Sequence, residues 1–336
     1  MGYHLSGEAG SFAVSEGLAS RLSELGWDVL STSSRRTPIA RLLDMVRTVW
    51  TRRREYDLAH VDVYSGRAFA WAEAVCRELA WLGKPFILTL RGGNLPEFSR
   101  RWPGRVRRLL SVAAAVTTPS AYLRERLSAF RSDLLLIPNA LELASYPFRL
   151  REKAAPSLVW VRTFHAIYDP DLAARVVARL GSEPARVHLT MTGRDRDGSR
   201  DRFLRLVGEL GLTDRVTVLG PAAKAEVPAR LQQGDIYLNT ARIDNTPVTV
   251  MEAMACGLCV ISTNVGGIPY LVEAEQNALL VPPGDDAAMA AAVRRVVAEP
   301  GLARKLSSNA RSAMERFGWE TVLPQWEALL DRVARG

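Results

Sequence analysis

The sequence lacks the features that would mark a membrane-spanning, secreted or metal-dependent protein. No stretch of its 336 residues approaches the roughly 18 to 20 apolar residues that a membrane-spanning helix requires. Residues 1–20 have no basic start followed by an apolar core, so they do not predict a signal peptide. The three cysteines and four histidines have neither disulfide nor metal-ligand spacing. We therefore expect a cytoplasmic protein that binds no metal.

Lysine is scarce as well. The chain has only Lys84, Lys153, Lys224 and Lys305, and none lies in a context that suggests a pyridoxal phosphate site. A phosphorylase that uses pyridoxal phosphate needs such a lysine, because the aldehyde of that cofactor is held by one. We therefore do not expect a phosphorylase, and we expect no cofactor.

Positive charge is concentrated in the first half of the chain. Residues 1–150 hold 21 Lys and Arg against 14 Asp and Glu, whereas residues 151–336 hold 23 against 22. The arginines gather in 35–54 and 100–108, where they alternate with Leu, Val and Trp. This pattern is typical of a helix on an anionic inner-membrane surface, but also of a solvated helix face beside a core stripe, and both interpretations stay open. No nucleic-acid-binding motif accompanies the charge, so we expect no nucleic-acid partner.

Short apolar runs alternate with helical patterns along the chain, which is typical of α/β domains with parallel sheets. The length suits two domains of roughly 150 residues each. A soft stretch of mixed charge at 139–156 is the expected linker. We predict an N-terminal domain at 1–145, a C-terminal domain at 146–318 and a final helix at 319–336. Ligands of two such sheets bind beyond the carboxyl ends of the strands, in a cleft between the domains.

The apolar patterns also place individual elements. In the first domain we expect strands at 27–31, 58–63, 85–89, 114–118 and 134–137, and helices at 18–25, 69–82 and 121–130. In the second domain we expect strands at 158–162, 187–192, 216–219, 236–239 and 259–263, and helices at 172–180, 202–210, 227–232, 248–256, 286–298, 301–316 and 319–335. Only residues 1–5 precede the first glycine-rich turn, so the opening strand is either short or begins upstream of this sequence.

The run from Asp244 to Pro269 has the pattern of a binding site. Asn245 or Thr246 suits the N-cap of the helix at 248–256, and Pro247 suits its first position. The amino end of that helix offers unpaired backbone N–H groups and roughly half a positive charge, which together favour a diphosphate. Glu252 lies about one turn further along, where its carboxylate can accept hydrogen bonds from a vicinal diol such as ribose. Asp244 lies in the preceding loop, within reach of the hydroxyls of a second sugar.

The same run resembles the Glu-x7-Glu segment of family 4 glycosyltransferases, which have the two-domain GT-B fold. Asp244 and Glu252 stand at the positions of its two acids. Further segments are similar to the family in order along the chain: Gly7 to Gly10, Pro138-Asn139, Arg162, Gly193, Glu252 to Gly257, Gly266 to Pro269, Leu279 to Asp285 and Phe317 to Trp319. The resemblance implies two Rossmann-like domains that face one another across a cleft, with a C-terminal helix that crosses back to the N-terminal domain.

The resemblance also implies an activity. A retaining enzyme would transfer a sugar from a nucleotide-diphosphate donor to a glycan or lipid-linked acceptor, in the synthesis of a cell-surface polysaccharide or glycolipid. Family members usually need no metal. Arg162 would neutralise the diphosphate, Glu252 would hold the ribose and Asp244 the donor sugar. The remaining donor-binding residues would be Asn245, Thr246, Pro247, Val248, Thr249, Gly193, Gly7 and Gly10.

Three positions depart from the family pattern. The first acid is Asp244 rather than Glu, and the lysine that usually follows the arginine by about five residues is absent. Arg242 or Arg194 could supply part of the missing charge. The N-domain strand that often ends in Thr-His-Gly reads Thr89-Leu90-Arg91-Gly92-Gly93. We expect Arg91 to assume part of the missing positive charge, and we count it with Arg162 and Asp244 among the catalytic candidates.

Two other functions stay open from the sequence. A catalytically weakened protein that only binds sugar nucleotides would fit the short front strand and the missing lysine. A nucleotide-sugar epimerase of similar fold would need acid and base groups around the sugar, and the sequence offers no convincing set.

Overall fold

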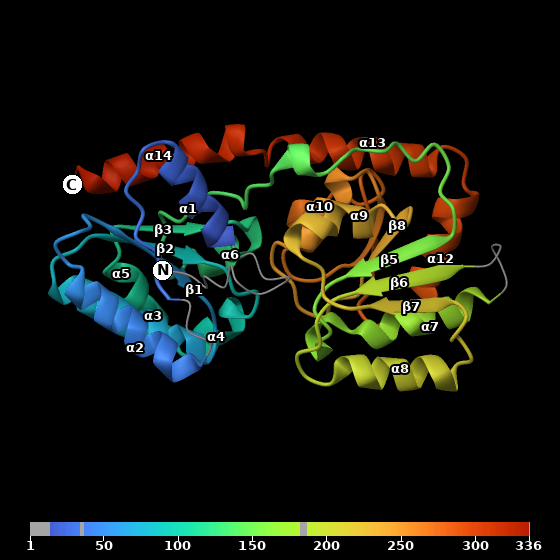
Figure 1. The fold of residues 1–336 in the computed structure, drawn as a ribbon, viewed down its shortest axis with the longest axis horizontal. Coiled ribbons are helices and arrows are strands. Elements are labelled where there is room, and N and C mark those ends of the chain that lie inside the picture. Colours follow the sequence, from blue (N-terminus) through green and yellow to red (C-terminus); the bar gives the residue numbers. More distant parts are fainter. Residues whose placement is uncertain (1–13, 34–36, 182–186, 336) are drawn as a thin grey trace. The chain divides into compact units, whose positions relative to one another are not determined.

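The computed structural model describes residues 14–33, 37–181 and 187–335. The chain divides into two compact units (Figure 1): unit 1 is Met1–Ala140 with Trp319–Gly336, and unit 2 is Leu141–Gly318. The first boundary lies five residues before the expected one, and residues 141–156 belong to unit 2 rather than to a free linker. Gly7 and Gly10 lie outside the described residues.

Unit 1 is a parallel sheet with helices on both faces. Its strands are β1 (Ala59–Val63), β2 (Phe86–Leu90), β3 (Ala115–Thr118) and β4 (Leu135–Leu136), and they lie in the order β1-β2-β3-β4. Its helices are α1 (Val14–Glu24), α2 (Pro38–Thr51), α3 (Arg67–Trp81), α4 (Leu95–Arg101), α5 (Pro103–Ser111), α6 (Ala121–Leu127) and α14 (Trp319–Ala334). Every residue of β2 and β3 is buried, as expected of parallel strands covered on both sides.

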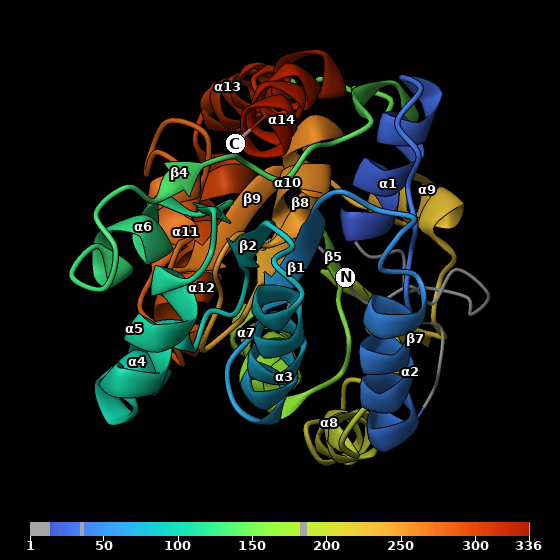
Figure 2. The ribbon, with the colours of Figure 1, turned by 90° about the vertical axis from the view of Figure 1, so that its left-hand side faces the viewer.

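The two faces of this sheet have separate cores, because successive side chains of a strand point to opposite sides. Leu88 and Val116 pack among α2, α3, α5 and α6. Ile87 and Ala115 point the other way and pack against α1 and α14, where Trp326 is buried. Figures 1 and 2 both show α1 and α14 on one side of this sheet and α2 and α3 on the other. The final helix is therefore part of the core of unit 1.

The strand expected at 27–31 is a wrong prediction. The structure has no regular element at 27–33, and the side chains of Val29 and Leu30 are exposed. An apolar run becomes a strand only where a neighbouring strand accepts its backbone hydrogen bonds. Among the described residues, β1 pairs with β2 alone, so its other edge forms no ladder with this segment.

Unit 2 has a larger parallel sheet. Its strands are β5 (Ser157–Val161), β6 (His188–Thr192), β7 (Val216–Leu219), β8 (Ile236–Asn239), β9 (Cys259–Thr263) and β10 (Leu279–Val281), in the order β10-β9-β8-β5-β6-β7. Its helices are α7 (Pro170–Leu180), α8 (Ser199–Glu209), α9 (Val227–Leu231), α10 (Val248–Ala255), α11 (Ile268–Leu271), α12 (Asp286–Ala298) and α13 (Leu302–Glu315). The unit also contains the short 3-10 turns η1 (Leu143–Ser145), η2 (Ala166–Tyr168) and η3 (Lys224–Glu226). The strand order reverses between β5 and β8.

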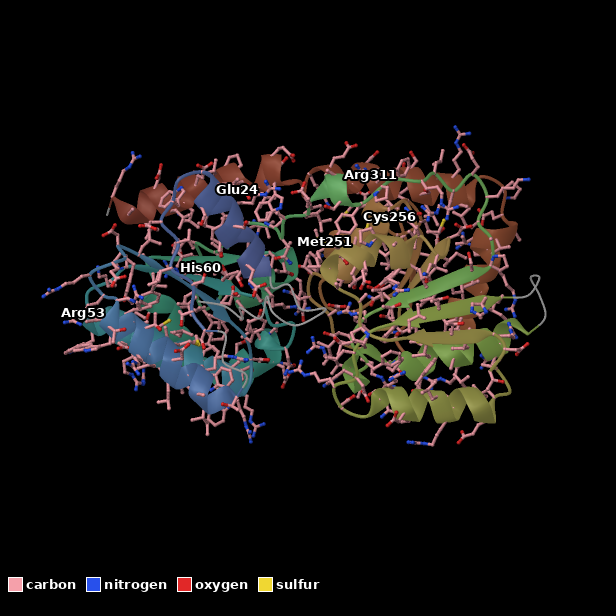
Figure 3. All side chains as sticks on the ribbon, viewed as in Figure 1. Glu24, Arg53, His60, Met251, Cys256 and Arg311 are labelled. Atoms are coloured by element: carbon pink, nitrogen blue, oxygen red, sulfur yellow. The ribbon has the colours of Figure 1, made fainter. Side chains whose placement is uncertain are left out.

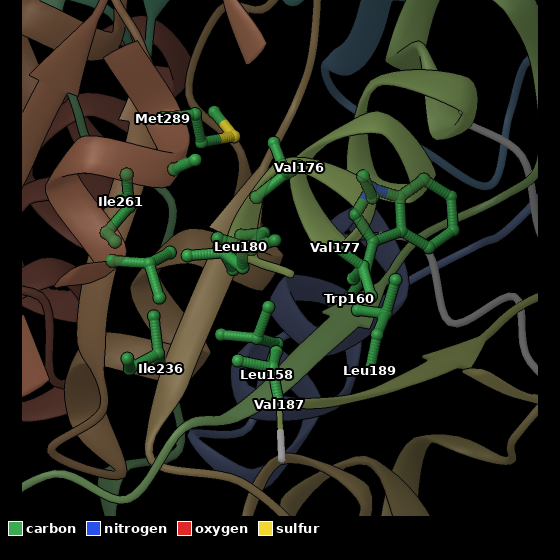
Figure 4. Close-up of a cluster of buried hydrophobic side chains, with 14 of the residues drawn as sticks. Leu158, Trp160, Val176, Val177, Leu180, Val187, Leu189, Ile236, Ile261 and Met289 are labelled. Atoms are coloured by element: carbon green, nitrogen blue, oxygen red, sulfur yellow. The ribbon is translucent and has the colours of Figure 1, made fainter. Parts of the chain in front are cut away.

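The sheet of unit 2 also separates two buried clusters. Leu158 and Trp160 of β5 face α7, α8 and α12, whereas Val159 and Val161 face α9, α10 and α11. Helix α13 contributes to both clusters. Figure 4 shows part of the first cluster, with side chains from β5, β6, β8, α7 and α12 in mutual contact. These two layers fix the strand ends on which the site described below is built.

Trp160 is a test of this packing. Its side chain is fully buried, its ring centroid lies 5.0 Å from that of Phe164, and its Nε1 donates to Thr240 Oγ1 at 2.9 Å. Trp160→Ala should lower the free energy of unfolding by about 3–5 kcal/mol, because it removes a large buried ring and leaves a cavity. Urea unfolding followed by circular dichroism measures the change. Leu204→Ala on the exposed face of α8 is the matched control, and equal losses in the two variants would contradict this packing.

Candidate functional site

The point where the strand order of unit 2 reverses brings two loops together. Strand β5 ends at Val161 and is followed directly by Arg162, and strand β8 ends at Asn239 and is followed by the loop that contains Asp244. In open α/β sheets, ligands bind beyond the carboxyl ends of the strands at such a reversal. The segment singled out in the sequence therefore lies where the topology of unit 2 places a ligand.

Arg162 and Asp244 form a buried ion pair across this reversal. Arg162 Nη1 lies 2.7 Å from Asp244 Oδ2, and both side chains are less than a tenth exposed. The guanidinium also lies 4.0 Å from the centroid of the Tyr168 ring, an attractive cation–π contact. Burial alone would lower the pKa of Arg162, but Asp244, together with the neighbouring Tyr168 and Tyr237, raises that pKa above its ordinary value. The site therefore holds a permanent positive charge that Asp244 balances.

Two glycines allow the backbones to approach beneath this pair. A Cβ atom at Gly193 would lie 1.7 Å from the carbonyl oxygen of Arg162, and one at Gly266 would lie 2.0 Å from that of Asp244. Gly266 also has a φ of 53°, a backbone conformation that residues with a side chain rarely adopt. Both glycines are therefore required to hold Arg162 and Asp244 in place, and Gly193 acts here through the backbone.

Helix α10 begins directly after the Asp244 loop, but not as the sequence predicted. Its N-cap is Pro247, with extended backbone at ψ 112°, and its first helical residue is Val248, so neither Asn245 nor Thr246 caps the helix. The Pro247 carbonyl accepts the first bonds of the helix, from the N–H groups of Val250 and Met251. A proline cannot donate but can accept, which suits it to this position. The N–H groups of Val248 and Thr249 precede the first intrahelical donors and have no helical acceptor.

Glu252 is the second buried carboxylate of the site. Its side chain is 3% exposed, and its Oε1 accepts a hydrogen bond from the Tyr146 hydroxyl at 2.9 Å. The ammonium group of Lys224 contacts the same oxygen. Burial and the neighbouring charge of Glu252 raise the pKa of Tyr146, so its hydroxyl stays protonated and donates. The sequence did not identify Tyr146 or Lys224: the first was assigned to a linker, and the second was noted only as one of four lysines.

Arg242, one of the two further basic groups that the sequence offered in this unit, has a partner of its own. Arg242 Nε donates to Asp169 Oδ2 at 2.8 Å, so its charge is balanced by a carboxylate outside the Arg162 pair. Asp195 and Asp197 accept hydrogen bonds from backbone N–H groups of the turn before α8. Their carboxylates therefore organise a turn, and Arg162 remains the arginine at the strand ends that faces Asp244.

In unit 1, Arg91 follows β2 and is buried with a carboxylate of its own. It forms an ion pair with Asp62, and its Nη1 donates to Asn139 Oδ1 at 2.9 Å. Burial alone would raise the pKa of Asp62, but the nearby charges of Arg91 and His60 lower it below its ordinary value. A role for Arg91 at the donor diphosphate stays a prediction.

Comparison with known proteins agrees with the resemblance noted in the sequence. Residues 155–299 match the family model described as "Glycosyl transferases group 1". Several relatives bear the name D-inositol 3-phosphate glycosyltransferase. That of Streptomyces bingchenggensis is 28% identical over 57% of this chain and 41% of its own, and that of Kineococcus radiotolerans is 24% identical over 79% of this chain and 69% of its own. The chain thus spans less than half of the first relative.

Solved structures of low sequence identity share the fold. A sucrose-phosphate synthase from Thermosynechococcus elongatus superposes with a TM-score of 0.80 at 21% identity, over 95% of this chain and 92% of its own. Anabaena HepE, in complex with UDP and glucose, superposes with a TM-score of 0.72 at 18% identity, over 85% of this chain and 81% of its own. The predicted α/β architecture of the GT-B type is therefore confirmed.

The buried pair in unit 1 gives a prediction on stability. Asp62→Asn should lower the free energy of unfolding by about 3–5 kcal/mol near neutral pH, because it leaves the charge of Arg91 buried without a carboxylate. Since the folded pKa of Asp62 is depressed, its contribution is present above its unfolded pKa and is lost as the pH falls through the folded value.

Urea unfolding of the wild type and Asp62→Asn between about pH 7 and about pH 3 tests this, and the difference should narrow with acid. Asp331→Asn, which removes an exposed partner of Arg335 on α14, is the control and should cost less than about 1 kcal/mol. A difference for Asp62→Asn that does not change with pH would contradict the assignment.

Proposed function

We propose that this chain, whose residues 155–299 match the family model described as glycosyl transferases group 1, transfers a sugar from a nucleotide-diphosphate donor to an acceptor. The observation that carries the proposal is the grouping of Arg162, Asp244, the amino end of α10 and Glu252 at the strand reversal of unit 2. HepE, a structural neighbour, is described in complex with UDP and glucose, which supports a sugar nucleotide as the ligand class.

The three parts of the site match three parts of such a donor. The guanidinium of Arg162 and the N–H groups of Val248 and Thr249 offer positive charge and donors to the diphosphate. The carboxylate of Glu252 accepts hydrogen bonds from the ribose hydroxyls. Asp244, fixed against Arg162, presents its carboxylate to the donor sugar. Each group is held before the ligand arrives, so that little reorganisation opposes binding.

The transfer itself follows from this arrangement. We propose that the bond between the anomeric carbon and the diphosphate oxygen breaks while the acceptor hydroxyl attacks from the same face, which retains the anomeric configuration. The proton of the acceptor hydroxyl passes to the oxygen of the departing diphosphate. Arg162 and the amino end of α10 stabilise the charge that develops there, and the rest of the rate comes from positioning. We assign a glycan or lipid-linked acceptor, as in surface polysaccharide or glycolipid synthesis.

Ligand binding tests the donor site directly. The melting temperature of the full chain should rise with at least one of UDP, ADP and GDP or their sugars, since a ligand at 100 times its dissociation constant adds about 2.7 kcal/mol. Arg162→Ala and Glu252→Gln should each weaken that binding by about 10- to 100-fold, because each removes a charge-assisted contact. Arg205→Ala on the exposed face of α8 is the matched control and should bind as the wild type does.

The outcomes separate the candidate functions. Stabilisation followed by release of free nucleoside diphosphate from a sugar nucleotide supports transfer. If the protein binds a sugar nucleotide but releases no nucleoside diphosphate with any acceptor, it is a protein that only binds sugar nucleotides. The absence of any nucleotide effect on the wild type would contradict the proposal.

We further propose that unit 1 docks on an anionic membrane surface through α2. One face of this helix is buried at Met45 and Val49, whereas Ile39 and Leu43 on the other face are 76% and 63% exposed. No helix in the described part of the chain is both long and apolar enough to cross a bilayer. Exposed apolar groups on a helix that lies flat insert into the interface instead.

Aromatic and basic groups extend this surface at the end of α2. Trp50 stacks on Trp81 with 5.3 Å between ring centroids, and their side chains are 42% and 71% exposed. The guanidinium of Arg53 lies 4.7 Å from the Trp50 ring, and Figure 3 shows Arg53 at the outer margin of unit 1. Arginines beside interfacial tryptophans favour anionic headgroups. The second basic run is less suited, because Trp102 and Pro103 divide it into the short helices α4 and α5.

Vesicle flotation tests the docking surface. The wild type should float with vesicles that contain phosphatidylglycerol and be released by salt, since both apolar insertion and screened charge contribute. Leu43→Ser combined with Trp81→Ser should abolish most of the flotation. Leu204→Ser on the exposed face of α8 in unit 2 is the control. The proposed docking surface would be contradicted if the double variant and the Leu204→Ser control floated equally, or if the wild type did not float.

A further inference from the structure

We propose that Lys224 is a positioning residue of the donor site, which holds Glu252 as an oriented anion and thereby sets a preference for nucleotides with an intact ribose diol. This inference rests on the proposed donor function. It assigns a role to a lysine that lies outside the sequence run from which the site was predicted.

Three segments that are distant in the sequence meet at one carboxylate oxygen. Tyr146 follows η1, Lys224 begins η3 and Glu252 lies in α10. The Tyr146 hydroxyl donates to Glu252 Oε1 at 2.9 Å, and the Lys224 ammonium forms an ion pair with the same atom. Lys224 Nζ also lies 5.6 Å from the centroid of the Tyr146 ring. The lysine is therefore held by both the carboxylate and the aromatic face.

The burial of the three groups is unequal. Glu252 and Tyr146 are buried, whereas the Lys224 side chain is 43% exposed. A carboxylate as deeply buried as Glu252 requires a compensating cation, because desolvation of an isolated charge costs several kcal/mol. Within the described ranges, Lys224 is the cation that forms a salt bridge with Glu252. The lysine thus reaches from the solvent side of the site to its innermost charge.

The geometry leaves one side of Glu252 for a ligand. Both contacts are made to Oε1, and among the described residues no further hydrogen bond to this side chain is present. A vicinal diol could therefore donate to Oε2 while Oε1 stays fixed. A carboxylate whose rotation is restrained in this way recognises a diol with less entropic cost than a free one.

The backbone of Tyr146, whose hydroxyl shares Glu252 Oε1 with Lys224, is held by Arg311. Arg311 Nη1 donates to the backbone carbonyls of Tyr146 at 3.1 Å and of Ala255 at 3.0 Å. Figure 3 shows Arg311 beside Cys256, at the carboxyl end of α10. The backbone of Tyr146 is thereby tied to the helix that carries Glu252, whereas Lys224 is the more exposed of the two donors to Oε1. Removal of Lys224 should release the orientation of the Glu252 carboxylate while Tyr146 keeps its place.

The test measures diol preference rather than affinity alone. Dissociation constants are determined by calorimetry for UDP, ADP and GDP and for the 2′-deoxy counterpart of each. The wild type should bind at least one ribonucleotide about tenfold or more tightly than its deoxy form, as the loss of a charge-assisted hydrogen bond implies. Lys224→Met should reduce that ratio to near one, whereas Lys224→Arg should retain most of it.

Matched variants separate positioning from folding. Lys153→Met removes an exposed lysine of unit 2 and should leave the ratio unchanged. Tyr146→Phe removes the other donor to Oε1 without a change in charge and should lower the ratio less than Lys224→Met does. If Lys224→Met lowers the melting temperature of the ligand-free protein, Lys224→Gln, which keeps a donor but no charge, should still lose the preference.

The results of these binding measurements distinguish the donor function from the proposed role of Lys224. A wild type that binds no nucleotide overturns the donor function and this inference together. A wild type that binds ribose and deoxyribose forms equally leaves the donor function standing and overturns the inference. A Lys224→Met protein that keeps the wild-type ratio, or that loses both forms to the same extent, also overturns it, because the lysine would then act elsewhere than on Glu252.

Discussion

The ion pair between Arg162 and Asp244 is the constraint on which the candidate site depends. It joins the end of β5 to the loop after β8, the two strands between which the order of the sheet reverses. Its 2.7 Å contact is possible only because Gly193 and Gly266 let the neighbouring backbones come within a distance that a side chain would prevent. The loop held in this way then sets the start of α10, and with it the direction of the first free N–H groups.

Two buried carboxylates with one cation each give the site its electrostatic character. Asp244 is balanced by Arg162, and Glu252 is balanced by Lys224. At the described residues of this site, the charges of Arg162 and Lys224 are therefore each balanced by a carboxylate before a diphosphate binds. The donors that have no helical partner are backbone N–H groups at the amino end of α10, so a diphosphate there would gain both these hydrogen bonds and a share of Arg162. The resting ion pairs keep the carboxylates oriented until a ligand competes for them.

The sequence predicted the fold of unit 2 more fully than its site. Strands β7, β8 and β9 lie at the predicted residues, because each is a short apolar run bounded by turn residues. Strands β8 and β9 are also buried on both faces, whereas β7 is a partly exposed edge strand. The prediction of a strand at 27–31 was wrong, because an apolar pattern does not reveal whether a neighbouring strand will pair with the segment. The predicted N-cap of α10 was wrong because Pro247 occupies that position and accepts hydrogen bonds through its backbone carbonyl. Preferences based on side-chain capping do not report a backbone acceptor. Tyr146 and Lys224 reach Glu252 across 106 and 28 residues, and no local pattern reports such contacts.

We infer above all that the strand reversal of unit 2 is a nucleotide site. A crystal structure of the full chain with UDP, ADP or GDP, whichever binds, tests this most directly. We expect the diphosphate to lie within hydrogen-bond distance of the N–H groups of Val248 and Thr249 and of the Arg162 guanidinium, with the ribose hydroxyls on Glu252. A nucleotide that binds away from the carboxyl ends of β5 and β8, with these groups unchanged, would contradict it.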